Sequence, residues 1–210
     1  KFICLQLTMN FCACGISMIG PFIGFDSPVT VIQMLWINII MDTLGGLAFA
    51  GEAPAARFLR KNPKRRAEPI LNRYMIFSLI LHSGFTLALG VAFLKMPAIT
   101  GRFRASEGNI CLLTAYFAFF IFSSVFNCFC ARTDRLNLFS GLQKNRVFIL
   151  IMAAVCAIQT AFIYLGGAVL RTVPLTPAEL AFTLLLSLLV IPADFLRKLA
   201  WRFGGNREGY

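Results

Sequence analysis

The sequence predicts an all-α polytopic membrane protein with six transmembrane helices packed as a bundle. Of the 210 residues, 58% are hydrophobic, and the mean hydropathy is +0.75, well above that of an ordinary soluble domain. Only 14% are charged, and they cluster between apolar runs that are each near the twenty residues needed to cross a hydrocarbon core. The runs are continuous rather than alternating, which argues against a β-barrel.

The first three spans follow from the apolar runs and the segments that separate them. Residues 2–25 form the first span, and a Ser-Pro turn at residues 27–28 leads into the second span, residues 31–51. The basic segment ARFLRKNPKRRAEPILNR, residues 56–73, follows it. Because so many charges are costly in hydrocarbon, this segment lies outside the membrane and the third span begins after it, over residues 74–94.

The last three spans are separated by polar connections. A loop containing proline, glycine and arginine precedes the fourth span, residues 111–130. A polar, basic loop precedes the fifth span, residues 147–170, and a short turn leads to the sixth, residues 178–196. We therefore expect one membrane domain over residues 1–200, followed by a cytoplasmic tail at residues 201–210.

The distribution of lysine and arginine predicts the orientation of the chain. An even number of spans places both termini on one side of the membrane. Only four of the twenty basic residues lie on the opposite side, namely Lys95, Arg102, Arg104 and Arg171. The positive-inside rule then places both termini in the cytoplasm. The net charge of +11 is explained by this topology, so it requires no nucleic-acid partner, although the basic loops can also contact anionic headgroups of the bilayer.

The second span carries polar residues that predict a cation site. Asn38 and Asp42 are four residues apart and so share one helix face. A carboxylate and an amide oxygen on one face suit a hard cation such as Ca²⁺. Gly45 and Gly46 follow, and they allow a neighbouring helix to approach or the helix to loosen so that carbonyls turn inward. Asn10, in the preceding antiparallel span, adds another oxygen.

The alternative is that Asn10, Asn38 and Asp42 form an interhelical hydrogen-bond cluster that holds no ion. Amides commonly join membrane helices in this way, so the two asparagines fit either interpretation. Asp42 favours the cation site, because burying a carboxylate without a partner costs several kcal/mol.

The segment QMLWINIIMDTLGGLAFAGEAP, residues 33–54, resembles the sixth membrane helix of P-type calcium-transporting ATPases, and the plasma-membrane type most closely. That family shows Gln-x-Leu-Trp-x-Asn-x-x-x-Asp, then small residues and Glu-Pro-Pro; here Ala53 replaces the first proline. LQLTMN at residues 5–10 and DSP at residues 26–28 resemble the fifth helix and its turn, and KNPKRRAEPILNR resembles the following cytoplasmic connector. Weaker similarity covers the last four spans.

The resemblance implies a single calcium site. Asn38 and Asp42 match cation ligands of the family, and Asn10 matches an asparagine that lines the transport region. Three ligand positions of two-calcium members carry other residues here: Ala13, Met41 and Ser124. A glutamate on the fourth family helix would lie upstream of this chain, so the ion cage would be incomplete without that segment.

The resemblance also implies that ATP and Mg²⁺ act through domains outside these residues. The chain contains no Asp-Lys-Thr-Gly phosphorylation motif and no nucleotide-binding segment, and its nine acids are dispersed. The chain also begins at the flank of a membrane helix without an initiator methionine, so we expect the C-terminal piece of a longer pump. The alternatives are a stand-alone six-helix module without ATPase activity and a pump for another cation.

Two further predictions concern residues of the third and last spans. His82, the only histidine, is expected to make a helix-packing hydrogen bond. Asp194, beside Arg197 and Lys198, is expected to form an ion pair at the cytoplasmic interface. The segment FLRKLAWRF, residues 195–203, is basic and amphipathic, and we interpret it as an interfacial helix, although it is distantly similar to a calmodulin target.

Overall fold

The computed structural model describes residues 1–51, 73–133 and 145–203, without the side chains of residues 41, 42 and 201–203. Within these residues, six helical segments are long and apolar enough to cross a membrane, as predicted. They are Phe2–Ile23, Val31–Ala50, Arg73–Lys95, Glu107–Arg132, Arg146–Leu165 and Pro177–Ala200. The observed ends lie within a few residues of the predicted ones at most boundaries.

The first two spans form an antiparallel hairpin. Helix α1 (Phe2–Ile19) continues into the 3₁₀ turn η1 (Gly20–Ile23), and α2 (Val31–Ile39) starts the second span. A Cβ on Gly20 would lie 2.6 Å from the ring of Pro28, so only glycine permits this close turn. The second span continues through the π-helical turn η2 (Ile40–Gly45) into α3 (Gly46–Ala50).

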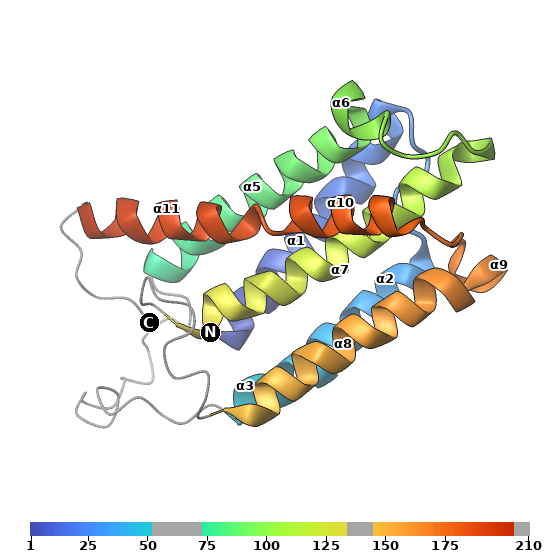
Figure 1. Ribbon diagram of the computed structural model, residues 1–210. Coiled ribbons are helices and arrows are strands. Elements are labelled where there is room, and N and C mark those ends of the chain that lie inside the picture. The colour runs from blue at the N-terminus through green and yellow to red at the C-terminus, as the bar shows by residue number, and fades with distance from the viewer. Residues whose placement is uncertain (52–72, 134–144, 204–210) are drawn as a thin grey trace, which may run out of the picture.

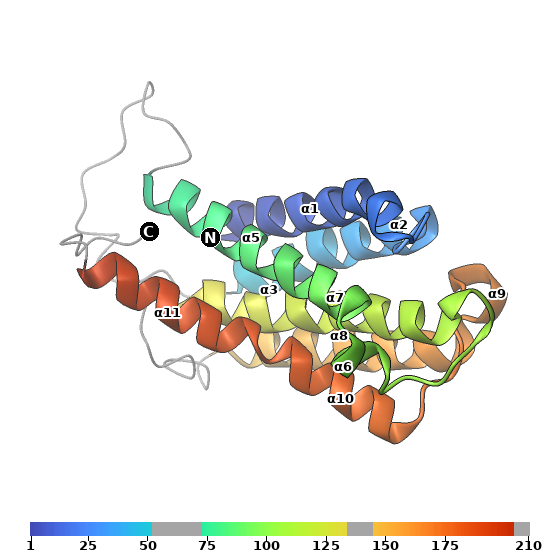
Figure 2. The same cartoon turned by 90° about the horizontal axis from the view of Figure 1, so that it is seen from above.

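Helix α7 (Ile110–Arg132) is the centre of the bundle. Apolar side chains lie on all its sides, and 18 of its 23 residues are buried, as expected for a helix surrounded by others. It contacts α1, α5 (Arg73–Lys95), α8 (Arg146–Leu165), and both halves of the last span, α10 (Pro177–Ser187) and α11 (Val190–Phe203). Figure 1 shows α8 running beside α2 and α3, and α10 and α11 crossing in front of α7. In Figure 2, α5 lies between α1 and α11.

Short helices complete the end of the bundle opposite the N-terminus. They are α6 (Pro97–Thr100), η3 (Glu107–Asn109) and α9 (Gly167–Leu170). The fifth span ends at Leu165 rather than at residue 170, because Gly167 adopts a φ of +46° and breaks the helix before α9. The N-terminus, the end of α3, the start of α5 and the end of α11 all lie at the other end (Figure 1).

The last span is broken between Ser187 and Val190. Pro192 lacks the N–H that would bond to the carbonyl of Leu188, so the chain turns before it continues as α11. Helix α11 then extends to Phe203, beyond the predicted end of the span at residue 196. The charged residues Asp194, Arg197 and Lys198 of α11 are buried within the bundle, where α11 packs against α5 and α7.

Gly90 provides a test of the packing between α5 and α7. A Cβ at this position would lie 2.9 Å from the hydroxyl oxygen of Tyr116, whose ring packs against Phe93 and Phe119. We expect Gly90→Leu to destabilise the fold by about 1–3 kcal/mol, because the added side chain overpacks a filled core. Thermal unfolding of the detergent-purified protein measures the effect.

The matched control lies on the same helix. A Cβ at Gly84 meets no atom within 4 Å, so Gly84→Leu is expected to leave the unfolding temperature unchanged. Equal unfolding temperatures for the two variants would contradict the packing described here.

Candidate functional site

The backbone between Asn38 and Gly46 departs from α-helical geometry. The turn η2 is π-helical over residues Ile40–Gly45, and the hydroxyl of Thr43 donates to the carbonyl of Ile39. Such turns are rare and occur frequently at functional sites. In hydrocarbon, irregular backbone is tolerated only where it is buried in protein or lines a cavity. The irregular turn therefore coincides with the segment for which the sequence predicts cation ligands.

The helix that leads into this turn is fixed at its outer end. Thr30 accepts a hydrogen bond from the backbone N–H of Gln33, and the Gln33 side chain accepts one from the N–H of Thr30, which completes a capping box. The amide of Gln33 is buried, and its Nε2 donates to the carbonyl of Leu170 at 2.7 Å. These bonds fix the start of α2 against α9, and so set the position of Asn38 two turns later.

The other end of the turn is held by aromatic contacts. The ring of Phe2 lies against Gly45 and Gly46, where an added Cβ would be 3.6 and 3.5 Å from its nearest ring atom. Phe2 also packs on Phe49 with 6.2 Å between ring centroids, and Phe49 meets Phe148 of α8 edge-on at 6.0 Å. Helix α1 thus reaches the two glycines through Phe2, at a distance that a Cβ would also allow, so a role for the glycines in this approach stays a prediction.

The structure describes the side chains of two of the three predicted ligands. Asn38 is half-buried on α2, and Asn10 is exposed on α1. The backbone of Asp42 lies in η2, but its side chain lies outside the described residues. Among the described residues, no three His, Cys, Asp or Glu side chains come together as metal ligands. A shared cage of Asn10, Asn38 and Asp42 therefore stays a prediction.

Two of the three positions at which two-calcium pumps carry other ligands are in the bundle core. Ala13 is 3% exposed and Ser124 is 2% exposed. The third, Met41, has its side chain outside the described residues. Neither Ala13 nor Ser124 supplies a carboxylate. The expectation of a single calcium site depends on these residue identities alone and stays a prediction.

The most strongly charged cluster inside the bundle is centred on Asp194. One carboxylate oxygen accepts hydrogen bonds from Nε and Nη2 of Arg197, at 3.0 and 2.7 Å, and lies 3.0 Å from Nε2 of His82. The other lies 2.5 Å from Nζ of Lys198. Arg197 also donates to the hydroxyl of Tyr74, and Lys198 donates to the carbonyl of Cys130. The cluster joins α5, α7 and α11.

This arrangement bears on the predictions for His82 and Asp194. His82 makes the expected helix-packing hydrogen bond, because its Nε2 pairs with Asp194 across α5 and α11. The expected ion pair of Asp194 with Arg197 and Lys198 is also present, and the three residues are buried among the helices, at 1%, 2% and 4% exposed. Arg197 donates to Tyr74, the second residue of α5, and Lys198 donates to the carbonyl of Cys130 near the end of α7, so the pair reaches the ends of two helices. The position of this pair at the cytoplasmic interface, and the interfacial interpretation of residues 195–203, stay predictions.

One sequence signal could have revealed this cluster. Asp194, Arg197 and Lys198 have the i, i+3 and i+4 spacing that places them on one helix face. Three charges on one face next to leucine-rich positions fit a buried ion pair as well as a surface one. The partner on α5 is decided by tertiary packing.

A second ion pair lies at the opposite end of the bundle. Glu179, in the first turn of α10, is buried and forms a capping box with Thr176. It also accepts hydrogen bonds from the backbone N–H and Nε of Arg104, at 3.0 and 3.1 Å. Hydrogen bonding to Glu179, and attraction to its charge, raise the pKa of Arg104. The pair fastens the loop after α6 onto the start of the last span.

We expect Asp194→Leu to destabilise the protein by about 3–5 kcal/mol, because the buried Arg197 and Lys198 would lose their counter-ion. Thermal unfolding of the purified protein measures the loss. The control is Asp26→Ala, at an exposed position of the outer turn, which should leave stability within about 0.5 kcal/mol of the parent. A small effect of Asp194→Leu would mean that the cluster does not stabilise the bundle.

The sequence comparisons agree with this architecture. Residues 26–200 match the family described as "Cation transporting ATPase, C-terminus". A probable calcium-transporting ATPase 9, plasma membrane-type, from Oryza sativa subsp. japonica is 32% identical over 176 residues, which is 83% of this chain and 17% of that protein. Calcium-transporting ATPase 12, plasma membrane-type, from Arabidopsis thaliana is 33% identical over 201 residues, or 94% of this chain and 19% of that protein. The plasma membrane calcium-transporting ATPase mca-1 from Caenorhabditis elegans is 32% identical over 221 aligned positions, which cover 97% of this chain and 18% of that protein. The chain thus spans less than a fifth of the length of each.

Proposed function

Because the chain belongs to the family of cation-transporting ATPase C-terminal regions, we propose that it is the membrane-domain portion of an ATP-driven calcium export pump. The relatives named above are plasma-membrane-type calcium-transporting ATPases, and their similarity covers most of this chain. The six apolar helices supply the bilayer-spanning body. ATP and Mg²⁺ act on the upstream part of the pump, and this chain carries the route of the ion.

In this proposal the chain binds one Ca²⁺ per cycle near mid-membrane. Asn38 and Asp42 provide oxygen ligands on one helix face, and Asn10 adds a third oxygen or a supporting hydrogen bond. The observation that carries the proposal is the π-helical turn Ile40–Gly45, which contains Asp42 and begins two residues after Asn38. A local break in the α-helix frees backbone carbonyls to join the side chains around a dehydrated cation.

The exposed position of Asn10 supports a site that is completed by other helices. An asparagine exposed in the middle of a membrane helix is unfavourable against lipid, because its amide would lack partners there. Upstream helices of the pump would cover this face of α1 and add the missing ligands. Phosphorylation of the distant catalytic domain would then change the geometry around the turn η2 and release the ion outward.

We also propose that both termini are cytoplasmic. The basic residues predict this orientation, and the N-terminus and the end of α11 lie at the same end of the bundle. The cytoplasmic segment at residues 56–73 would then contact the phosphorylation domain; all of it before Arg73 lies outside the described residues, as does the tail from residue 204.

Asp42→Asn tests the ion site. We expect ATP-dependent ⁴⁵Ca²⁺ uptake by vesicles containing the full-length protein to fall at least about tenfold, because a neutral amide replaces Asp42, the only acid of the span Val31–Ala50. Asn38→Ala should also reduce uptake, chiefly by raising the calcium concentration needed for half-maximal transport.

The matched control is Asn109→Ala, at an exposed position in the outer loop, which should transport normally. Uptake of ⁴⁵Ca²⁺ by Asp42→Asn at the parental rate would refute the site. If the parent took up ⁵⁴Mn²⁺ or ²²Na⁺ and not ⁴⁵Ca²⁺, the protein would be a pump for that other cation. Absence of an Asp-Lys-Thr-Gly motif upstream of Lys1 in the gene would favour the stand-alone membrane module instead.

A further inference from the structure

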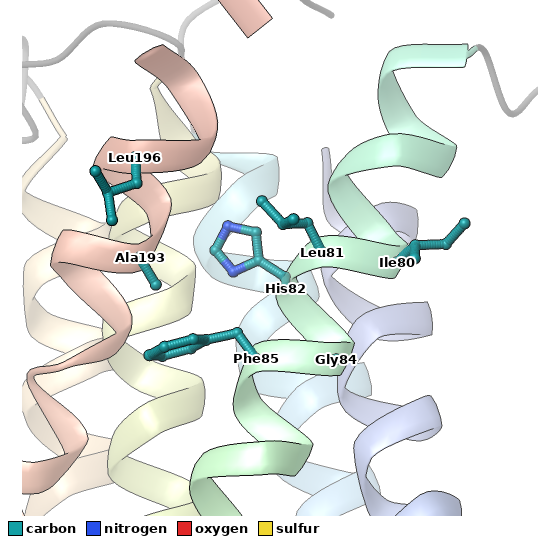
Figure 3. Close-up of a pocket in the computed structure, with 7 residues that line it drawn as sticks. All are labelled: Ile80, Leu81, His82, Gly84, Phe85, Ala193 and Leu196. Atoms are coloured by element: carbon teal, nitrogen blue, oxygen red, sulfur yellow. The ribbon is translucent and has the colours of Figure 1, made fainter. Parts of the chain in front are cut away.

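A cavity opens toward the lipid between α5 and α11, away from the proposed ion site. It has a volume of about 440 Å³, within the range of small-molecule sites. Its lining residues are shown in Figure 3: Ile80, Leu81, His82, Gly84, Phe85, Ala193 and Leu196. All except His82 are apolar. The cavity therefore offers hydrocarbon contacts on every side and a single polar side chain.

His82, which lines this cavity, has one ring nitrogen that makes no hydrogen bond within the described residues. Its side chain is 7% exposed, and its Nδ1 has no hydrogen-bond partner among the residues that the structure describes. The other ring nitrogen, Nε2, lies 3.0 Å from the carboxylate of Asp194, which also binds Arg197 and Lys198. A carboxylate paired with two cations only accepts hydrogen bonds, so Nε2 carries a ring proton, and in the neutral imidazole Nδ1 presents a lone pair. The cavity thus lacks one hydrogen-bond donor.

The length of the cavity favours a compact ligand. Along α5 it extends from Ile80 to Phe85, about 7.5 Å, and along α11 from Ala193 to Leu196, about 4.5 Å. A transmembrane helix of a partner protein would contact the groove over the full membrane thickness of about 30 Å. The lined region is only one to two helical turns long, which suits a small molecule better than a helix.

The depth of His82 excludes a lipid held by its headgroup. His82 is nine residues from Arg73 and thirteen from Lys95 on α5, so it lies about 13.5 Å and 19.5 Å from the two ends of that helix. Headgroups and the hydroxyls of interfacial lipids stay near the membrane surface, while acyl chains at this depth carry no donor. A ligand that satisfies Nδ1 must therefore bring its hydroxyl into the hydrocarbon region.

We propose that this cavity binds a compact apolar molecule with a single hydroxyl group, of the alkylphenol class, whose hydroxyl donates to Nδ1 of His82. The ring of Phe85 lies beside the imidazole in Figure 3 and offers an aromatic face to a phenol ring. Nδ1 is itself covered in the empty cavity, so a lining side chain must move aside on binding, and Phe85, which is 37% exposed, has the room to do so. The proposal is independent of the calcium site.

Photolabelling of the full-length protein tests the proposal. The probe is an alkylphenol that carries a diazirine on its alkyl chain, used in phosphatidylcholine nanodiscs and in native membranes. We expect adducts on the peptides that contain residues 80–85 and 193–196. With concentrations expressed per mole of lipid, 4-butylphenol should compete about fivefold more effectively than butylbenzene, which has the same shape without the donor.

Three variants locate the site. Gly84→Leu should abolish the adducts by filling the cavity, since a Cβ there meets no protein atom within 4 Å. Ala88→Leu, at an exposed position on α5 outside the lining, should label as the parent does. His82→Phe should keep the adducts but remove the preference for 4-butylphenol, because the acceptor is gone while the apolar walls remain.

Other outcomes would overturn the proposal. Equal competition by the two probes in the parent would show that the cavity takes apolar molecules without using His82. Labelling that persists in Gly84→Leu, or that falls on other peptides, would place the ligand elsewhere. Adducts formed in nanodiscs but absent from native membranes would mean that a membrane protein partner covers this groove.

Discussion

The carboxylate of Asp194 is the electrostatic centre on which one side of the bundle depends. It is shared by Arg197, Lys198 and His82, all within 3.0 Å, and its cationic partners reach on to Tyr74 and to the carbonyl of Cys130. These bonds tie α5, α7 and α11 together where no water can replace a missing partner. The two cations exceed the one carboxylate, so loss of Asp194 leaves both uncompensated, whereas loss of one cation leaves a balanced pair.

The chain divides into a rigid part and a part with irregular backbone. Helix α7 lies at the centre, with most of its surface buried by α1, α5, α8 and the last span, and its rings of Phe117, Phe119 and Phe120 fill the interior. The π-helical turn lies in the second span, held at one end by the Gln33 hydrogen bonds and at the other by Phe2. The turn is therefore held at both ends and has irregular backbone between them.

The sequence predicts much of this organisation correctly. Six apolar runs separated by charged segments require six spans, because only a helix satisfies its own backbone in hydrocarbon. The spacing of Asn38 and Asp42 identifies the second span as the polar one, and the structure has its non-α turn there. The break at Gly167 and the extension of α11 to Phe203 were missed, because hydropathy measures composition and not where a helix kinks or how far it continues beyond its apolar part.

The sequence by itself determined the fold class, the number of spans and the family, since these follow from local apolar length and from a motif of contiguous residues. Tertiary structure alone decided which charges are inside. Asp194, Arg197 and Lys198 read locally as an interfacial group, and only the approach of His82 and Tyr74 on α5, more than a hundred residues away in sequence, creates an interior site that satisfies them. The same approach leaves the cavity beside His82. Such long-range partners are set by helix packing, and no local pattern encodes them.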